Sequence, residues 1–233
     1  MGPDEEAWRK MKSLDGSDGA DRSADRSEKT DISNGSDKLG SDKHAVVIGA
    51  GISGLNCAAA LTKYFAKVTI IEADTVDLSE PSSRPGVPQD RQLHGLLARG
   101  LQGIEKFFPG VQDRIVEAGG AYNKFGKEVR WFMNGTWWSE RESKFGGIAM
   151  TRTFFEFQLR SEVLKKSNVV LQDQSKFANY IFSKDQKNVV GLKVLRDGLE
   201  EEIPTDLIVD CSGRHSKNYL QLQEMGYSAA PID

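Results

Sequence analysis

The stretch His44-Ala-Val-Val-Ile-Gly-Ala-Gly-Ile-Ser-Gly-Leu55 decides the fold. Ala45 to Ile48 is a short apolar run rich in β-branched residues, as expected of a buried parallel strand. Gly49, Gly51 and Gly54 follow it with G-x-G-x-x-G spacing. This spacing, directly after a strand, is typical of a turn that holds a dinucleotide.

The residues after the glycines complete the pattern. Few helix breakers occur from Ser53 to Phe65, which predicts a helix. A second β-branched run, Val68 to Ile71, predicts a parallel strand that ends on Glu72. The sequence therefore predicts a strand, tight turn, helix, strand unit that finishes in a carboxylate.

Each residue of the turn has a physical role in this hypothesis. Gly49 permits the tight turn, Gly51 leaves room for a pyrophosphate, and Gly54 lets the helix pack closely on the sheet. Ile52 and Ser53 open the helix, where free N–H groups and a partial positive charge attract phosphates. The alternative is a glycine-rich turn without a ligand.

Glu72 lies 18 residues past Gly54, close to the spacing expected of an acid that hydrogen-bonds a ribose hydroxyl. A carboxylate there would repel a 2′-phosphate, which argues against NADP in this pocket. The motif by itself does not separate FAD from NAD.

The composition excludes several classes of protein. The chain has 233 residues, enough for one large or two small domains, and a net charge of −3, so it has no general attraction to nucleic acid or anionic lipid. There is no metal-ligand cluster, no signal peptide and no apolar run of membrane-spanning length. Its two cysteines, Cys57 and Cys211, are expected to be small core residues, which favours a reducing, cytoplasmic compartment. The oligomeric state is left open.

The first 42 residues are acidic and poor in apolar side chains, which predicts disorder. Ala7 to Lys12 is a candidate short helix within them. The segment is either a regulatory or docking tail or an inert solvated extension.

The remaining segments are predicted from periodicity and turn signals. Asn134-Gly135 predicts a hairpin rich in tryptophan, whose rings either line an apolar cavity or pack across the strands. Thr151 is expected to cap a helix, with Glu156 interacting favourably with its dipole. The other expected elements are a loop over Ala73–Gln92, helices over His94–Phe108, Val111–Ala118, Thr153–Lys165 and Asn218–Met225, and strands over Gly146–Met150, Val169–Gln172, Phe177–Phe182, Val189–Leu195, Glu201–Ile203 and Asp206–Val209.

Three separated motifs resemble those of FAD-dependent monooxygenases of the aromatic-hydroxylase type. They are the glycine fingerprint with Glu72, the segment Arg84-Pro-Gly-Val-Pro-Gln89, and the strand that ends in Asp210-Cys-Ser-Gly-Arg214, where the family often has alanine at the Cys211 position. Gly86 to Gln89, continuing through His94–Leu101 to Phe108-Pro-Gly110, resembles the branch of bacterial polyether epoxidases. Thr151-Arg152, with the residues after it, resembles the helix that brings an arginine towards the cofactor.

The resemblance implies site residues in this chain. It places Gly49, Gly51 and Gly54, with the helix start at Ile52 and Ser53, at the FAD pyrophosphate. It places Glu72 and the following Ala73 at the adenosine ribose, Arg84 and Arg152 near the phosphates, and the backbone of Gln89 to His94 near the flavin ring. Asp210 and Gly213 belong to the strand end that closes on FAD. No catalytic residue and no metal site is implied.

The implied fold is α/β: a Rossmann-like, glutathione-reductase-type FAD-binding domain with a three-stranded meander and a partial, inserted α+β substrate domain. Residues 43–83 and 151–233 would form the FAD-binding domain, and residues 84–150 would hold the inserted loop, helices and partial substrate domain. Family members continue into a second Gly-Asp motif, so the chain is expected to lack the C-terminal part.

The implied activity is that of an oxidoreductase. NAD(P)H, a transient electron donor, would reduce FAD, and oxygen would then be transferred to an apolar organic substrate by hydroxylation or epoxidation. Two alternatives remain: a truncated, catalytically inactive FAD-binding module, and an NAD-binding dehydrogenase.

Overall fold

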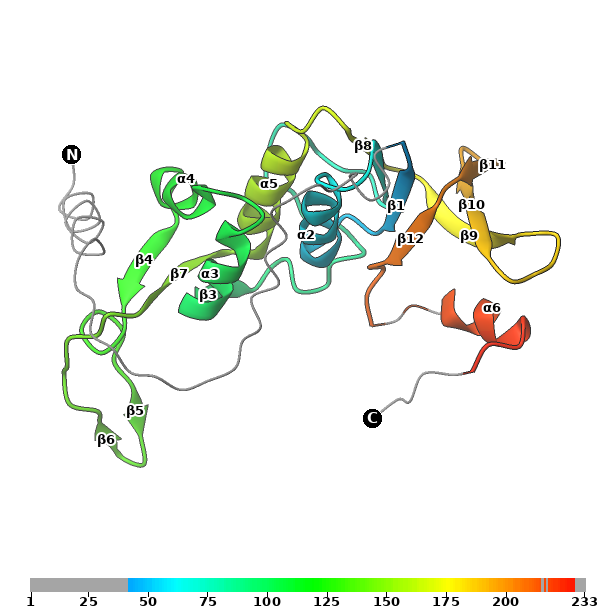
Figure 1. Cartoon of the computed structure of the whole chain (residues 1–233). Helices are drawn as coiled ribbons and strands as arrows, with labels where there is room; N and C mark the ends of the chain where they lie inside the picture. Colours follow the sequence, from blue (N-terminus) through cyan, green and yellow to red (C-terminus); the bar gives the residue numbers. More distant parts are fainter. Residues whose placement is uncertain (1–41, 215, 217, 229–233) are drawn as a thin grey trace, which may run out of the picture. The chain divides into compact units, whose positions relative to one another are not determined.

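A computed structural model describes residues 42–214, 216 and 218–228 (Figure 1). The expected disorder of the acidic segment and its candidate helix, Ala7 to Lys12, lie outside the described residues. In the described part, no helix has the length and apolar character needed to cross a bilayer.

A four-stranded parallel sheet forms the centre of the fold. Its strands are β1 (His44–Ile48), β2 (Lys67–Ile71), β8 (Val169–Gln172) and β12 (Leu207–Asp210), in the order β12-β1-β2-β8. Every neighbouring pair is parallel, and the helix α2 (Ile52–Leu61) forms the crossover from β1 to β2. The predicted glycine-rich crossover and the predicted parallel partner at Val169–Gln172 are both confirmed.

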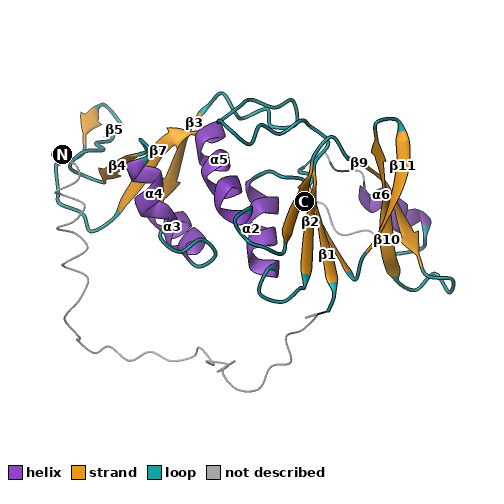
Figure 2. Ribbon diagram, turned by 90° about the horizontal axis from the view of Figure 1, so that it is seen from above, coloured by secondary structure: helices purple, strands orange, loops and turns teal. Residues whose placement is uncertain are grey.

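The two faces of this sheet are covered by different layers. On one face lie α2 and α5 (Arg152–Val163), and on the other lies an antiparallel meander of β9 (Lys176–Phe182), β10 (Val189–Arg196) and β11 (Leu199–Pro204) (Figure 2). Val47 packs with Leu55 in the helical layer, whereas Val46 packs with Leu192 in the meander layer. Burial on both faces explains why β1 is apolar from Ala45 to Ile48.

A second, antiparallel sheet supports a smaller layer of helices. Its order is β3-β7-β4, with β3 (Leu93–Leu97), β4 (Ala121–Lys124) and β7 (Gly146–Thr151). The helices α3 (Ala98–Glu105) and α4 (Val111–Glu117) join its residue Ile148 in the same core cluster as α5.

The prediction of a helix that begins at His94 was wrong for its first four residues. Residues 93–97 pair with β7 instead, and α3 begins at Ala98. Leu97, the last residue of β3, is 61% exposed. The sheet pairing wins here because β7 supplies a ladder partner that the local sequence cannot reveal.

The Asn134-Gly135 hairpin is confirmed, although its strands are shorter than predicted. They are β5 (Phe132–Met133) and β6 (Thr136–Trp137), and both turn residues have positive φ, as a type I′ turn requires.

The predicted helix after β12 is also present as α6 (Asn218–Glu224). Its Gln221 side chain accepts a hydrogen bond of 3.1 Å from the Tyr180 amide in β9. The α/β class predicted from the sequence is therefore confirmed.

Candidate functional site

The turn after β1 is fixed by the conformation of Gly49. Its φ is +98°, and its N–H donates to the Ile71 carbonyl at 2.8 Å, which ties the turn to the end of β2. A Cβ at this position would lie 2.7 Å from the Cys211 carbonyl oxygen. Glycine is therefore required twice, by the backbone angle and by the approach of the segment after β12.

The other two glycines differ in what surrounds them. A Cβ on Gly54 would collide with the Gly49 carbonyl oxygen, so glycine there allows α2 to pack against the turn. Among the described residues, a Cβ on Gly51 would meet only an Arg152 guanidinium nitrogen, 4.0 Å away. The packing of the chain therefore does not explain why residue 51 lacks a side chain. It leaves open space in front of Gly51, next to a cation.

The N-terminus of α2 faces this turn without a counter-charge of its own. Gly51 is the N-cap, no side chain caps the helix, and its first turn, which holds Ile52 and Ser53, contains no acidic residue. The free amides and the positive end of the helix dipole are thus available to an anion.

Glu72, directly after β2, is held with both carboxylate oxygens engaged. Oε2 accepts from the Ala50 amide at 2.8 Å, and Oε1 accepts from the Asp74 amide at 3.1 Å. Arg84 Nη1 lies 2.8 Å from Oε2. Burial by itself would raise the pKa of Glu72, but the two amide hydrogen bonds and Arg84 outweigh it and lower the pKa from 4.5.

This lowered pKa leads to a prediction about acid stability. Because the folded-state pKa of Glu72 lies below its unfolded value, the ionised carboxylate stabilises the fold above about pH 4.5. That contribution is lost as the pH falls through the folded-state pKa. We expect Glu72→Gln to unfold more easily than wild type at pH 7, and the difference to shrink below pH 4. Urea unfolding at both pH values measures it, and a constant difference would contradict the assignment.

Arg84 connects the glycine turn to α5. Its side chain is 3% exposed, and its guanidinium pairs with Glu72 and with Glu156 of α5. Its own amide donates to Asp90 at 3.0 Å. Burial would lower the pKa of Arg84, but Glu156 and Glu72 together raise it. Arg84 is thus a buried, paired cation rather than a solvated loop charge.

Glu156 is the residue that sequence reasoning misplaced. It was expected to act on the helix dipole of α5, whose cap is confirmed, because Thr151 Oγ1 accepts from the Phe154 amide at 3.2 Å. Instead the Glu156 carboxylate is 5% exposed and contacts three guanidinium groups. Arg152 lies at 3.5 Å and Arg160 at 3.6 Å, in addition to Arg84. The spacing Arg152-x-x-x-Glu156-x-x-x-Arg160 was the available signal, since both pairs are i,i+4.

Arg152 is the cation of this cluster that faces the open space at Gly51. Its Nε is buried and has no hydrogen-bond partner among the described residues. Burial and the neighbouring Arg84 lower its pKa despite Glu156. A buried donor without a partner costs free energy. An anionic ligand in front of Gly51 would lie next to the Arg152 guanidinium and the N-terminus of α2, so the residues present fit the diphosphate of a dinucleotide.

The remaining predicted site residues are Asp210, Gly213, Ala73 and Gln89. Asp210 ends β12 beside Ile48 of β1, and its carboxylate accepts from the Ser212 amide at 2.9 Å. Gly213 follows with a φ of +98°. Ala73 and Gln89 are exposed: Ala73 directly follows Glu72, and Gln89 lies in the loop after Arg84. The structure therefore brings together the glycine turn, Glu72, Arg84 and Arg152, with Asp210 at the adjacent strand end.

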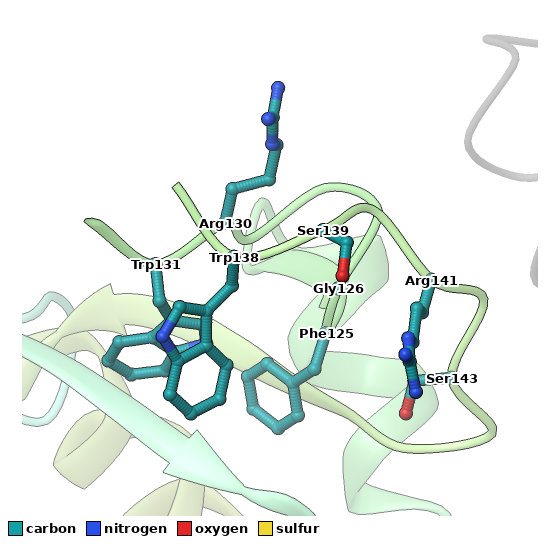
Figure 3. Close-up of a pocket in the computed structure, with 8 residues that line it drawn as sticks. All are labelled: Phe125, Gly126, Arg130, Trp131, Trp138, Ser139, Arg141 and Ser143. Carbon is teal, nitrogen blue, oxygen red and sulfur yellow. The ribbon is translucent and has the colours of Figure 1, made fainter. Parts of the chain in front are cut away.

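A cavity adjoins the tryptophan hairpin. A cavity of about 230 Å³ is lined by Phe125, Trp131 and Trp138 together with the polar residues Arg130, Ser139, Arg141 and Ser143 and with Gly126. Figure 3 shows the three aromatic rings on the same side of the hairpin and Arg130 pointing away from them. The other two rings, Phe132 and Trp137, pack against each other with centroids 5.2 Å apart. The hairpin thus shows both features weighed from the sequence, a cavity lining and a cross-strand pair.

Comparison with known proteins identifies relatives of parts of this chain. Residues 7–82 match the family model described as Pyridine nucleotide-disulphide oxidoreductase. Protein Rv3254 of Mycobacterium tuberculosis (strain ATCC 25618 / H37Rv) is 35% identical over 202 residues, which cover 82% of this chain. The chain spans only 42% of the length of that relative.

Several solved structures have a fold similar to that of this chain. PqsL of Pseudomonas aeruginosa, a probable FAD-dependent monooxygenase, matches with a TM-score of 0.56 and 15% identity, over 82% of this chain and 48% of its own. The chain has the fold of the FAD-dependent monooxygenases. This flavin-monooxygenase fold also matches p-nitrophenol 4-monooxygenase PnpA of Pseudomonas putida DLL-E4, with a TM-score of 0.57 and 14% identity, over 77% and 43% of the two chains. The myxobacterial FAD-dependent halogenase CndH matches with a TM-score of 0.55 and 18% identity, over 77% and 39%.

Proposed function

We propose that this chain binds FAD at the turn after β1 and belongs to an FAD-dependent monooxygenase. One observation carries the proposal: Gly51 faces open space next to a guanidinium nitrogen of Arg152, and Glu72 directly follows the neighbouring strand β2. A diphosphate and a ribose, at the spacing of a dinucleotide, satisfy both features. The chain shares its fold with PqsL, described as a probable FAD-dependent monooxygenase, and with PnpA, a p-nitrophenol 4-monooxygenase. This similarity supports FAD over NAD as the bound dinucleotide.

The proposed roles follow from where the residues lie. Gly49, Gly51 and Gly54, with the α2 start at Ile52 and Ser53, would hold the pyrophosphate, and Arg152 would pair with it. Glu72, next to Ala73, would hydrogen-bond the adenosine ribose, with Arg84 bridging Glu72 to α5. Asp210 and Gly213 would close on the cofactor from β12, and the backbone at Gln89 would approach the flavin ring.

Bound FAD would supply the redox and oxygen-transfer chemistry, with NAD(P)H as the electron donor and O₂ as co-substrate. The family description of residues 7–82 as a pyridine nucleotide oxidoreductase supports that donor. The chain's own residues bind and orient the cofactor, and none is assigned a proton-transfer role.

The substrate of the whole enzyme is proposed to be an apolar organic molecule that is hydroxylated or epoxidised. The aromatic cavity at Phe125, Trp131 and Trp138 supports an apolar partner. Gly86 to Gln89 and His94 to Leu101 support the branch of the polyether epoxidases. We propose residues 43–83 and 151–233 as the FAD-binding domain and residues 84–150 as the inserted part of a substrate domain.

The test is to mix the purified full chain with FAD and remove free cofactor by gel filtration. We expect the protein to keep a yellow flavin spectrum, and ADP to compete with FAD because the site holds the ADP half. Riboflavin, which lacks phosphates and adenosine, is expected to bind at least about a hundredfold more weakly, a difference of ~2.7 kcal/mol.

The outcomes separate the three readings. Bound FAD with NAD(P)H oxidation supports the enzyme, and bound FAD without turnover supports a binding module. Thermal protection by NAD in the absence of any flavin binding would overturn the proposal in favour of a dehydrogenase.

A further inference from the structure

The two cysteines of the chain lie against each other behind the glycine turn. Cys57 sits in the middle of α2, and Cys211 is the first residue after β12, 154 positions later. Their sulfur atoms are 3.7 Å apart, which is contact distance. Both are free thiols that pack, partly buried, against the helical core layer. The expectation that they are small core residues leaves this contact unexplained.

We propose that Cys57 and Cys211 form a reversible disulfide when the protein meets a thiol oxidant. The bond would join α2 to the segment after β12, the two elements that border Gly49. The sulfur atoms need to approach by about 1.7 Å to reach bonding distance, since a disulfide is about 2.05 Å long. Closing this distance would require a change of χ1 rotamer at one or both cysteines.

The backbone on both sides is already fixed in place. The Cys211 amide donates to the Ile48 carbonyl at 2.8 Å, and its own carbonyl packs against Gly49. Cys57 is held by the hydrogen bonds of α2. The two thiols are therefore presented to each other by rigid elements, and no other cysteine in the sequence competes for either of them.

The chemistry balances with a small-molecule disulfide as oxidant. The Cys57 thiolate attacks the small disulfide, forms a mixed disulfide and releases one small thiol. The Cys211 sulfur then displaces the second small thiol from Cys57, and its proton passes to solvent. Two protein thiols are oxidised and one small disulfide is reduced to two thiols.

The order of attack follows from the surroundings of Cys211. Burial, reinforced by Cys57 and Asp210, raises the pKa of the Cys211 thiol, so this residue is protonated at neutral pH. A protonated thiol is a poor nucleophile. Cys211 therefore acts second, in the intramolecular step, where proximity compensates for its low thiolate fraction.

The test treats the full-length chain with oxidised glutathione and then measures intact mass and free thiols under denaturing conditions. We expect a monomer that has lost two hydrogens, carries no glutathione, shows no free thiol and returns to the starting mass with dithiothreitol. A proteolytic digest should contain the Cys57 peptide linked to the Cys211 peptide.

Single variants provide the matched control. In Cys57→Ser and Cys211→Ser the remaining thiol has no partner, so oxidation is expected to stop at a glutathione adduct or to leave the thiol free. The cross-link also lowers the conformational entropy of the unfolded state. The melting temperature of the oxidised wild type should therefore be about 4 °C or more above that of the reduced form. Neither variant should show this shift.

Wild-type results decide the proposal even if a variant folds poorly. Two glutathione adducts on one wild-type chain, two unreacted thiols, or a disulfide only between two chains would each overturn it.

Discussion

Replacing Gly51 with glutamate is expected to abolish FAD binding. The new carboxylate would occupy the open space in front of α2 and would pair with Arg152, which now lies 4.0 Å from the Cβ position. It would then repel the diphosphate in a partly buried site, where charges interact strongly. We expect the affinity for FAD to fall at least about a thousandfold, which corresponds to ~4 kcal/mol.

The fold should survive this change, because no other atom of the described part of the chain lies within 4 Å of a Cβ on Gly51. The flavin absorbance of the protein after gel filtration measures binding, and a thermal melt without FAD reports the fold. Gly103→Glu is the matched control, because Gly103 lies in α3 and a Cβ there meets nothing within 4 Å. That variant should keep its flavin. Full flavin retention by Gly51→Glu would refute the assignment of the turn.

Replacing Glu156 with glutamine is expected to cause a large loss of stability. The substitution keeps the size of the side chain but removes the negative charge that Arg84, Arg152 and Arg160 share. Arg84 keeps its pair with Glu72, but Arg152 and Arg160 lose their contact with the Glu156 charge. Removal of one partner from a buried ion cluster typically costs about 3–5 kcal/mol. We expect a decrease of that size in the free energy of unfolding, measured by urea denaturation at neutral pH.

Glu162 on the same helix offers a matched control. Its carboxylate pairs with Arg114 at 3.1 Å and with Lys165 at 2.6 Å, but it is 18% exposed and Lys165 is 67% exposed. Ion pairs near the surface contribute about 0–1 kcal/mol, so Glu162→Gln should cost little. Equal losses in the two variants would show that Glu156 is an ordinary helix carboxylate.

Glu156 also contacts two arginines of the proposed cofactor site. Arg84 and Arg152 come from different segments, and Glu156 is the anion that both of them contact. A diphosphate that binds at Gly51 would bring further negative charge to the same cations. FAD should therefore restore part of the stability lost in Glu156→Gln, which a melt with and without FAD measures.

The sequence by itself determined the unit of strand, glycine turn, helix and parallel strand. The apolar run from Ala45 to Ile48 indicates a buried strand, since a strand covered on both faces is apolar at successive positions. Gly49 and Gly54 could be assigned roles because their requirements, a positive φ and a close helix contact, arise within a few residues of each other. Thr151 as a helix cap and Asn134-Gly135 as a hairpin turn are local in the same sense, and both are confirmed.

Only the tertiary structure decided which distant side chains meet. Residues 93–97 became a strand because β7 pairs with them, and no helical periodicity could foresee that partner. Arg84 is buried because Glu72 and Glu156, which lie 12 positions before it and 72 after it, neutralise it from two different elements. Cys57 and Cys211 touch because β12 returns to the sheet beside β1. Local preferences are encoded in neighbouring residues, whereas ion pairs and thiol contacts depend on chain crossings that a single sequence does not specify.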